Sequence, residues 1–348
     1  MKSLEIGNIK LKYPIIQGGM GVGVSLSNLA SSVTLAGGLG VISAAQIGYL
    51  DPLFKKNPIE ANLKALKEHI LIAKEKALGG PIGVNIMVAQ NMYEEYVKCA
   101  ISSGVDIIIS GAGLPMKLPQ LVKNTGVKIA PIVSSLKAAR VILKRWEKKD
   151  DITCDMLVVE NHKAGGHLGF KKEDIIAYEN AKNFDDEFKN IVEYVKEFEV
   201  KFNKEVPVIY AGGVFDKNDI EHCLSIGANG VQMATRFVPT YECDASEEFK
   251  QAYISAKKED VKLCSSPVGL PGRAIANKFT KSSIREDINK CYKCLAKCDI
   301  KTIPYCITDR LIRSVKGDVD NGLVFCGSNA YRCDKIMSVK DLMAELTQ

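Results

Sequence analysis

Short apolar runs recur along the chain, and each ends in small or polar residues before a stretch with helical spacing begins. The runs are rich in valine and isoleucine and do not alternate strictly with polar residues, which is typical of parallel strands covered on both sides. Eight strands are predicted, at residues 13–17, 39–43, 81–87, 105–110, 127–131, 155–160, 206–211 and 230–234. The intervening segments predict helices, most clearly at residues 59–78, 91–103, 135–148, 182–202 and 217–226.

Eight strand–helix units in about 240 residues match the size of an α/β protein of the TIM (β/α)8 barrel type. A doubly wound open sheet is the alternative, but its dinucleotide fingerprint requires G-x-G-x-x-G and an acidic residue ~20 positions later. The glycines at positions 19, 21 and 23 resemble that motif only superficially, because Asp51 does not fall into register. The pattern therefore favours the barrel.

The pattern changes after about residue 240. A helix is predicted at residues 246–258, residues 263–278 resemble a loop, cysteines concentrate from 291 to 306, and a last helix lies near 339–346. This part of the chain is too short and too irregular for an independent core. We predict a barrel domain over residues 1–245 and an extension over residues 246–348 that covers the barrel mouth or one flank.

Composition and charge narrow the possible partners and location. The 348 residues are 46% hydrophobic and 25% charged, with a formal charge of +6 and both signs interspersed, so the basic patch expected of a nucleic-acid-binding protein is missing. No charged residue lies between Lys12 and Asp51, but eight glycines and several amides there argue against a membrane helix. The amino terminus lacks the apolar core of a secretory signal. We therefore expect a cytoplasmic protein that binds neither nucleic acid nor membrane.

Eleven cysteines in a reducing compartment suggest metal or redox chemistry before disulfides. Cys291, Cys294, Cys298 and Cys306 lie within 16 residues and could hold zinc or an iron–sulfur cluster, since thiolates select these metals. Their spacing matches neither the paired C-x2-C of a zinc ribbon nor the bacterial ferredoxin run. Reduced thiols that pack in a core, or a redox pair, stay open as alternatives.

The carboxyl ends of the predicted strands carry many glycines, a few amides and hydroxyls, and little charge. In a TIM barrel these ends form the functional face. The pattern lacks the histidine and aspartate cluster of a metal-dependent hydrolase and the paired carboxylates of a glycosidase. A glycine-lined mouth suits a flat ligand such as a flavin. Residues 210–214 and 233–236 lie where barrels commonly bind phosphate, and Gly212 and Gly213 permit close backbone approach or simply make a tight turn.

A histidine follows the sixth predicted strand, in the glycine-rich segment AGGHLG. His167 is the candidate for proton exchange near neutral pH, and a surface histidine without a role is the alternative. His162 could face the same pocket. Lys163 and Arg273 bring positive charge near the mouth, and for Arg273 a structural role is favoured over contact with a phosphate.

Seven segments in this order, YPIIQGGMG, AGGLGVIS, GVNIMV, ISGAG, AGGHLG, YAGGV and QMATRF, make the chain resemble the nitronate monooxygenase family over roughly residues 10–280. That superfamily of FMN-containing barrels also includes the flavin-dependent enoyl-ACP reductases. The resemblance implies one non-covalently bound FMN and a catalytic role for His167. It places the isoalloxazine on Gly18, Gly19, Met20, Asn85 and Glu160, includes Gly166 in the cofactor-binding set, and places the phosphate on Gly212, Gly213, Ala234 and Thr235.

The resemblance also implies a reaction, in which an alkyl nitronate is oxidised with oxygen to a carbonyl compound and nitrite. The alternative within the same fold is an NAD(P)H-dependent enoyl-ACP reductase acting on an enoyl thioester. From a different class, a non-catalytic flavin- or metal-binding redox sensor is the second alternative. Family members commonly carry Gln-Gly and then an acidic residue before AGGH, whereas Glu160, Asn161, His162 and Lys163 stand there in this chain. A homodimer is compatible with the resemblance.

Overall fold

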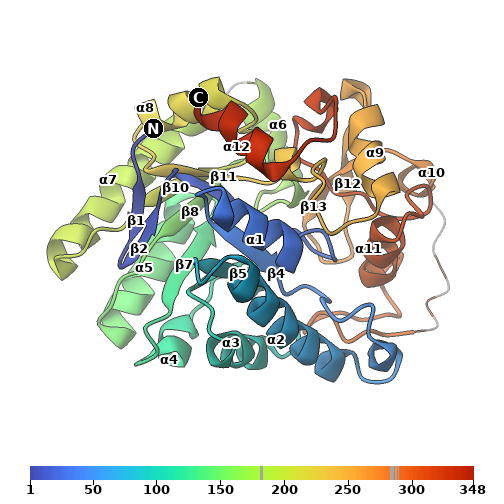
Figure 1. Ribbon diagram of the computed structural model, residues 1–348, viewed down its shortest axis with the longest axis horizontal. Coiled ribbons are helices and arrows are strands. Elements are labelled where there is room, and N and C mark those ends of the chain that lie inside the picture. Colours follow the sequence, from blue (N-terminus) through green and yellow to red (C-terminus); the bar gives the residue numbers. More distant parts are fainter. Residues whose placement is uncertain (181–182, 283–285, 287, 289) are drawn as a thin grey trace.

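A closed ring of parallel strands forms the centre of the protein (Figure 1). The computed structural model describes residues 1–180, 183–282, 286, 288 and 290–348. Within these residues the ring contains eight strands, namely β3 (Ile15–Gln17), β4 (Gly40–Ser43), β5 (Ile82–Met87), β6 (Ile107–Gly111), β7 (Lys128–Val133), β8 (Leu157–Glu160), β10 (Val208–Ala211) and β11 (Gly230–Met233). All eight coincide with predicted strands.

The ring closes between β3 and β4. The backbone N–H of Gln17 donates to the Leu39 carbonyl at 2.9 Å, and the Leu39 N–H donates to the Ile15 carbonyl at 3.0 Å. At the other side of β3, β11 pairs with it in parallel register, so every strand of the ring has two neighbours. This arrangement confirms the predicted TIM barrel, in which the side chains of one strand end all meet at one mouth.

Helices connect the strands and cover the outside of the ring. They are α1 (Ser27–Leu35), α2 (Pro58–Lys76), α3 (Tyr93–Ser102), α4 (Leu118–Val122), α5 (Leu136–Asp150), α6 (Lys172–Asn180), α7 (Phe184–Phe202) and α8 (Lys217–Ser225). Polar caps fix where several of them begin; Asp216 and Asp219, for example, form a reciprocal capping box at the start of α8. Among the described residues, no helix combines the length and apolar character needed to cross a bilayer.

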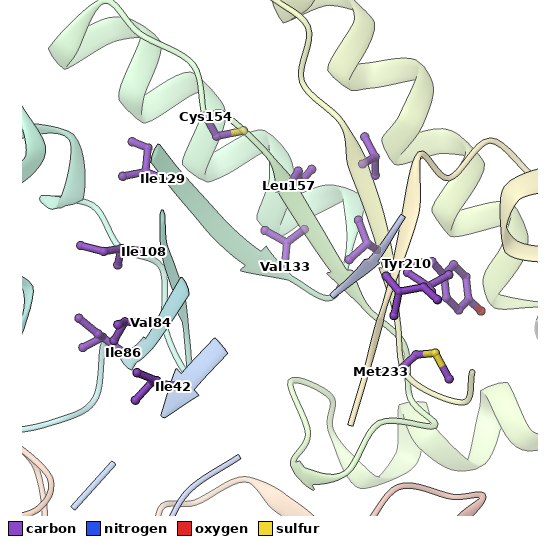
Figure 2. Packing of buried hydrophobic residues seen from close by; sticks show 14 of the residues in the cluster. Ile42, Val84, Ile86, Ile108, Ile129, Val133, Cys154, Leu157, Tyr210 and Met233 are labelled. Carbon is purple, nitrogen blue, oxygen red and sulfur yellow. The ribbon is translucent and has the colours of Figure 1, made fainter. Parts of the chain in front are cut away.

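Two apolar layers hold the barrel together. The outer layer lies between strands and helices, and Figure 2 shows members of it on the strands, such as Ile42, Val84 and Leu157. The inner layer fills the ring, where Ile16, Ile107 and their neighbours pack against the hairpin formed by β1 (Leu4–Ile6) and β2 (Ile9–Leu11). The hairpin thus packs on the interior of the ring, and the carboxyl ends of the strands stay available for a site.

The carboxy-terminal part of the chain both covers the barrel and completes its wall. It contains α9 (Glu247–Ser255), β12 (Val261–Ser265), β13 (Pro271–Ile275), α10 (Lys278–Lys281), α11 (Ile307–Val315) and α12 (Val339–Thr347). Helix α12 packs against α1 and α8 and buries its apolar side chains in the outer layer of the barrel (Figure 1). It therefore occupies the place of the helix that would follow β11. The domain boundary near residue 245 stays a prediction.

The prediction of a loop at residues 263–278 is wrong in part. Strands β12 and β13 pair there as an antiparallel hairpin, and β13 also pairs with the short strand β9 (Gly166–His167). The turn between the strands contains Ser266, Pro267 and Gly269, the last at a φ of +79°. These turn-forming residues obscured the flanking strand pattern. The hairpin matters because it fixes the segment that carries His167.

Candidate functional site

One cavity of about 690 Å³ opens at the carboxyl ends of the barrel strands. This volume lies within the usual range of sites for small molecules and cofactors. Every residue predicted to bind the cofactor or to act in catalysis lines it: Gly18, Gly19, Met20, Asn85, Glu160, Gly166, His167, Gly212, Gly213, Ala234 and Thr235. The structure thus brings together positions that are more than 200 residues apart in the chain.

Glycine is required where the loops after β3 and β10 pass close to other groups. A Cβ added at Gly19 would lie 2.4 Å from the Cβ of Asn85, and one at Gly18 would lie 3.3 Å from the Cγ of Gln232. Gly212 has a φ of +95°, and a Cβ there would lie 2.9 Å from the backbone nitrogen of Ala164. The absence of side chains leaves bare backbone exposed to the cavity, which permits close approach of a flat or anionic ligand.

Glu160 ends β8 and lines the cavity, where it is the one carboxyl group among the predicted site residues. Burial raises its pKa to about 7, although the backbone N–H of Gly169 offsets part of that rise. The carboxyl group is therefore close to half protonated at neutral pH. It can donate a hydrogen bond when neutral and repels anions when ionised, so its charge controls what binds beside it.

His167 lies on β9, where β13 holds it through pairing with Gly272. Its Nε2 lies 2.7 Å from the hydroxyl oxygen of Ser266, and its ring meets that of Phe325 edge-on at a centroid distance of 5.0 Å. Burial lowers the pKa of His167 to about 4, so the imidazole is neutral at physiological pH. With one ring nitrogen on Ser266, the other can form one hydrogen bond with a ligand in the cavity.

The loops after β10 and β11 form one end of the cavity. Gly212 and Gly213 both have positive φ, and Thr235 begins a short 3-10 helix, Thr235–Phe237. The carboxy-terminal segment closes on this end, since the Gly327 N–H donates to the Thr235 hydroxyl at 3.3 Å. Backbone donors from adjacent strand ends at a barrel mouth are the usual construction of a phosphate site.

The carboxy-terminal part contributes cavity residues that sequence reasoning missed. Ser266, which contacts His167, lies in the hairpin that had been predicted as a loop. Apolar side chains from several separate segments also line the cavity: Leu270, Leu295, Ile307, Leu311, Leu323 and Phe325. The sequence around these residues carries no local signal that distinguishes a cavity-lining side chain from a core side chain. Only the tertiary fold shows that they face the site.

His162 and Arg273 stabilise the loop that precedes His167. His162 does not line the cavity; its ring stacks on Tyr178 at 5.2 Å, and its two nitrogens are buried without a hydrogen-bond partner among the described residues. Arg273 is buried and donates from Nη1 to the carbonyls of His162 and Ala164, each at 2.7 Å. Its Nη2 reaches Glu179 at 3.4 Å. Arg273 therefore has the structural role that was favoured.

The predicted metal site at Cys291, Cys294, Cys298 and Cys306 is not supported. Among the described residues, no three or more histidine, cysteine or acidic side chains are grouped so as to hold a metal ion. Burial raises the pKa of Cys306 to about 11 and also raises that of Cys294, so both side chains are neutral thiols in this structure. The backbone here instead docks on the loop after β5, where the Asn91 N–H donates to the Cys294 carbonyl at 3.1 Å.

Comparison with known proteins shows to which family the chain belongs. The model of the nitronate monooxygenase family matches residues 2–348. A probable nitronate monooxygenase of Staphylococcus saprophyticus is 26% identical over 295 residues, covering 78% of each chain. The (3aS,4S,5R,7aS)-5-hydroxy-7a-methyl-1-oxo-octahydro-1H-indene-4-carboxyl-CoA dehydrogenase of Mycobacterium tuberculosis is 26% identical over 274 residues, covering 78% of this chain and 66% of that protein.

Solved structures share the whole fold at low identity. FabK from Thermotoga maritima aligns with a TM-score of 0.70 and 24% identity, covering 97% of this chain and 92% of that chain. Nitroalkane oxidase from Streptomyces ansochromogenes aligns with a TM-score of 0.71 and 19% identity, covering 97% and 95%. The family match, which extends over nearly the full length, carries the assignment. The chain belongs to the nitronate monooxygenase family and is an enzyme of the oxidoreductase class.

Proposed function

We propose that the protein is an FMN-dependent oxidoreductase that oxidises alkyl nitronates to a carbonyl compound and nitrite. The observation that carries this proposal is the composition of one cavity. It combines a glycine-lined wall with Asn85 and Glu160, a backbone-rich end suited to phosphate, and a buried histidine at the rim. Family membership supports the flavin and the reaction type.

The residues present fit a flavin mononucleotide. Gly18 and Gly19 leave bare backbone against which a flat ring can lie, while Gly212 and Gly213 do the same for a phosphate. Gln232 lines the cavity, and its side-chain oxygen is buried without a partner among the described residues, so it is free to accept a hydrogen bond from a ligand N–H. When bound, FMN would supply the capacity to accept electrons from the substrate.

His167 would hold the anionic nitro group of the substrate through a hydrogen bond. With a pKa lowered to about 4, its imidazole is a poor base for deprotonating a neutral nitroalkane but remains an uncharged donor at neutral pH. Ser266 fixes the ring by contacting Nε2. The other ring nitrogen, Nδ1, would then be the one that donates a hydrogen bond to the substrate. These properties favour a nitronate, which is already an anion, over its neutral parent compound.

Nitrite release tests the proposed reaction. The purified holoprotein is mixed with propionate 3-nitronate in air, and nitrite is measured over time alongside oxygen consumption. We expect nitrite to form over many turnovers. The same mixture with flavin-free protein is the blank. A holoprotein that contains FMN but releases no nitrite above the blank, over a range of nitronates, would exclude this reaction while leaving the flavin assignment intact.

A second candidate function is favoured by the apolar residues that line the cavity. Leu270, Leu295, Ile307 and Phe325 would accept a hydrocarbon chain better than a small nitronate. An NAD(P)H-dependent reductase acting on an enoyl thioester would use such a surface for the acyl chain. Oxidation of NADH by the holoprotein that depends on added crotonyl thioester would favour this candidate.

Assembly and location remain predictions of the same proposal. A small-molecule substrate is expected, in the reducing cytoplasm that the cysteine content suggests, and a homodimer is compatible with the family resemblance. All eleven cysteines are free in the structure. Light scattering on the holoprotein after size-exclusion chromatography tests the dimer directly, and a monomer across the micromolar range would contradict it.

A further inference from the structure

The carboxy-terminal segment 327–329 binds three loops at the phosphate end of the cavity. The side-chain amide of Asn329 donates to the Gly213 carbonyl at 2.7 Å, and the Ser328 N–H donates to the Lys163 carbonyl at 3.1 Å. Gly327 lines the cavity, and a Cβ on it would lie 2.5 Å from the Thr235 hydroxyl oxygen. The segment therefore approaches the loops after β8, β10 and β11 as closely as backbone allows.

Lys163 brings the positive charge to this end. It lines the cavity, and its side chain runs over Gly213, where an added Cβ would meet both Cβ and Cδ of Lys163 at 3.0 Å. Its backbone is held on both sides, because its N–H donates to the Asn161 side-chain oxygen at 2.5 Å and its carbonyl accepts from Ser328. The amide of Asn161 in turn donates to the Tyr210 hydroxyl at 2.6 Å.

The surrounding charges leave Lys163 as the cation that an anion would meet. Arg273 already binds two carbonyls and Glu179, while Arg332 is paired with Asp216 at 2.6 Å. Lys163 has no carboxylate within ion-pair distance in the part of the chain that the structure describes. A phosphate monoester carries close to two negative charges at neutral pH, so an unpaired ammonium beside its backbone donors stabilises it.

We propose that Lys163 and the segment 327–329 complete the phosphate end of the cofactor site, so that the protein selects flavin mononucleotide over riboflavin. This inference rests on the proposed FMN binding. Lys163 supplies the positive charge at this end of the cavity, where its side chain lies over Gly213. Asn329 supports the site indirectly, because its hydrogen bond to Gly213 holds the glycine loop against the cavity.

Flavin titration tests the proposal without measuring turnover. The flavin is removed, and binding of FMN and of riboflavin to the apoprotein is followed separately by quenching of flavin fluorescence. In Lys163→Met we expect FMN affinity to fall at least tenfold, whereas riboflavin affinity changes less than twofold. Lys163→Arg should retain FMN affinity, and Lys172→Met, which removes an exposed lysine that does not line the cavity, should change neither ligand.

Salt and the tail provide two further measurements. FMN affinity of the unmodified protein should fall with ionic strength more steeply than that of Lys163→Met, since one charge pair is absent in the variant. Asn329→Ala should weaken FMN more than riboflavin. Equal loss of both flavins in Lys163→Met, or unchanged FMN affinity, would overturn the inference while FMN binding itself stands. An apoprotein that binds neither flavin would overturn the proposed function as well.

Discussion

The imidazole of His167 faces the cavity as a neutral ring that Ser266 and Phe325 hold from two sides. Replacing it with phenylalanine keeps a ring of similar size against Phe325 but removes both nitrogens. If the ring donates a hydrogen bond to the substrate anion, His167→Phe should lower kcat/KM about 10²- to 10³-fold, as loss of one such donor does in other enzymes.

Steady-state kinetics with propionate 3-nitronate check this expectation, with the flavin spectrum as a measure of an intact site. His222→Phe is the matched control, because His222 lies on α8, contacts Asp185, and is not among the residues that line the cavity. Should His167→Phe keep more than half of the activity with its flavin bound, the histidine has no part in the reaction.

Ionisation of Glu160 should make kcat/KM depend on pH near neutrality, whereas ionisation of His167 should not. Because burial raises its pKa to about 7, the carboxyl group changes from neutral to anionic as pH rises through neutrality. An ionised carboxylate repels an anionic substrate, so kcat/KM for a nitronate should fall as pH rises through about 7. In Glu160→Gln the side chain cannot ionise, and the profile should stay flat across that range.

The pH profile of kcat/KM from pH 5.5 to 8.5 distinguishes the two residues. His167, with a pKa lowered to about 4, titrates below this window and should add no inflection within it. A Glu160→Gln profile with the same fall near pH 7 as the unmodified enzyme would assign the ionisation to another group.

Gly212 has both a backbone conformation that favours glycine and a position at the cavity where a side chain would not fit. Gly212→Ala places a methyl group 2.9 Å from the Ala164 nitrogen, at a positive φ of +95° that alanine adopts reluctantly. Gly79→Ala carries the same type of backbone cost, at a φ of +78°, but its methyl group meets nothing within 4 Å. We therefore expect Gly212→Ala to lose FMN affinity at least tenfold and Gly79→Ala to retain it.

Fluorescence titration with FMN measures both variants, and thermal unfolding reports the shared backbone cost. Equal FMN affinities in the two variants would mean that the loop after β10 does not contact the cofactor.

At the level of elements, α12 tests whether the carboxy-terminal part folds separately from the barrel or forms part of its stable core. Leu342 is fully buried in the outer layer, although it lies almost at the end of the chain. Leu342→Ala should lower the free energy of unfolding by about 2–5 kcal/mol, because the methyl groups lost leave a cavity in a packed layer. Lys340→Ala, on the exposed side of the same helix, should change it by less than about 0.5 kcal/mol.

Chemical denaturation followed by circular dichroism checks this pair of variants. A Leu342→Ala protein as stable as Lys340→Ala, or one with a separate early transition, would show that α12 folds independently of the barrel.

The elements also show where sequence reasoning succeeds and where it stops. The eight strands were predictable because each is a short apolar run with a small or polar residue at its carboxyl end, a local signal. Strands β12 and β13 were missed because Pro267 and Gly269 in their turn dominate the local pattern, and because β13 itself begins with Pro271 and Gly272, which are uncommon inside strands. The metal hypothesis rested on the concentration of four cysteines within 16 residues, which does not reveal that Cys294 lies buried against the loop after β5.

For the molecule as a whole, the cavity is built by both parts of the chain. The glycine-rich wall and the loops after β10 and β11 belong to the barrel, and their place at the mouth was predictable from motifs such as YAGGV and QMATRF. The apolar lining from Leu270, Ile307 and Phe325, and the contact of Gly327 with Thr235, depend on where the carboxy-terminal segments that carry them fold back over the mouth. Such long-range packing has no local signature, so the sequence indicated the cofactor class better than the shape of the substrate pocket.

The central claim is that a flavin in this cavity takes electrons from a nitronate. The most direct measurement is the visible spectrum of the holoprotein after anaerobic rapid mixing, once with propionate 3-nitronate and once with NADH. We predict loss of the oxidised flavin absorbance with the nitronate alone. Loss with NADH alone would contradict the nitronate assignment in favour of the reductase, and a protein without flavin absorbance after reconstitution with FMN would contradict both.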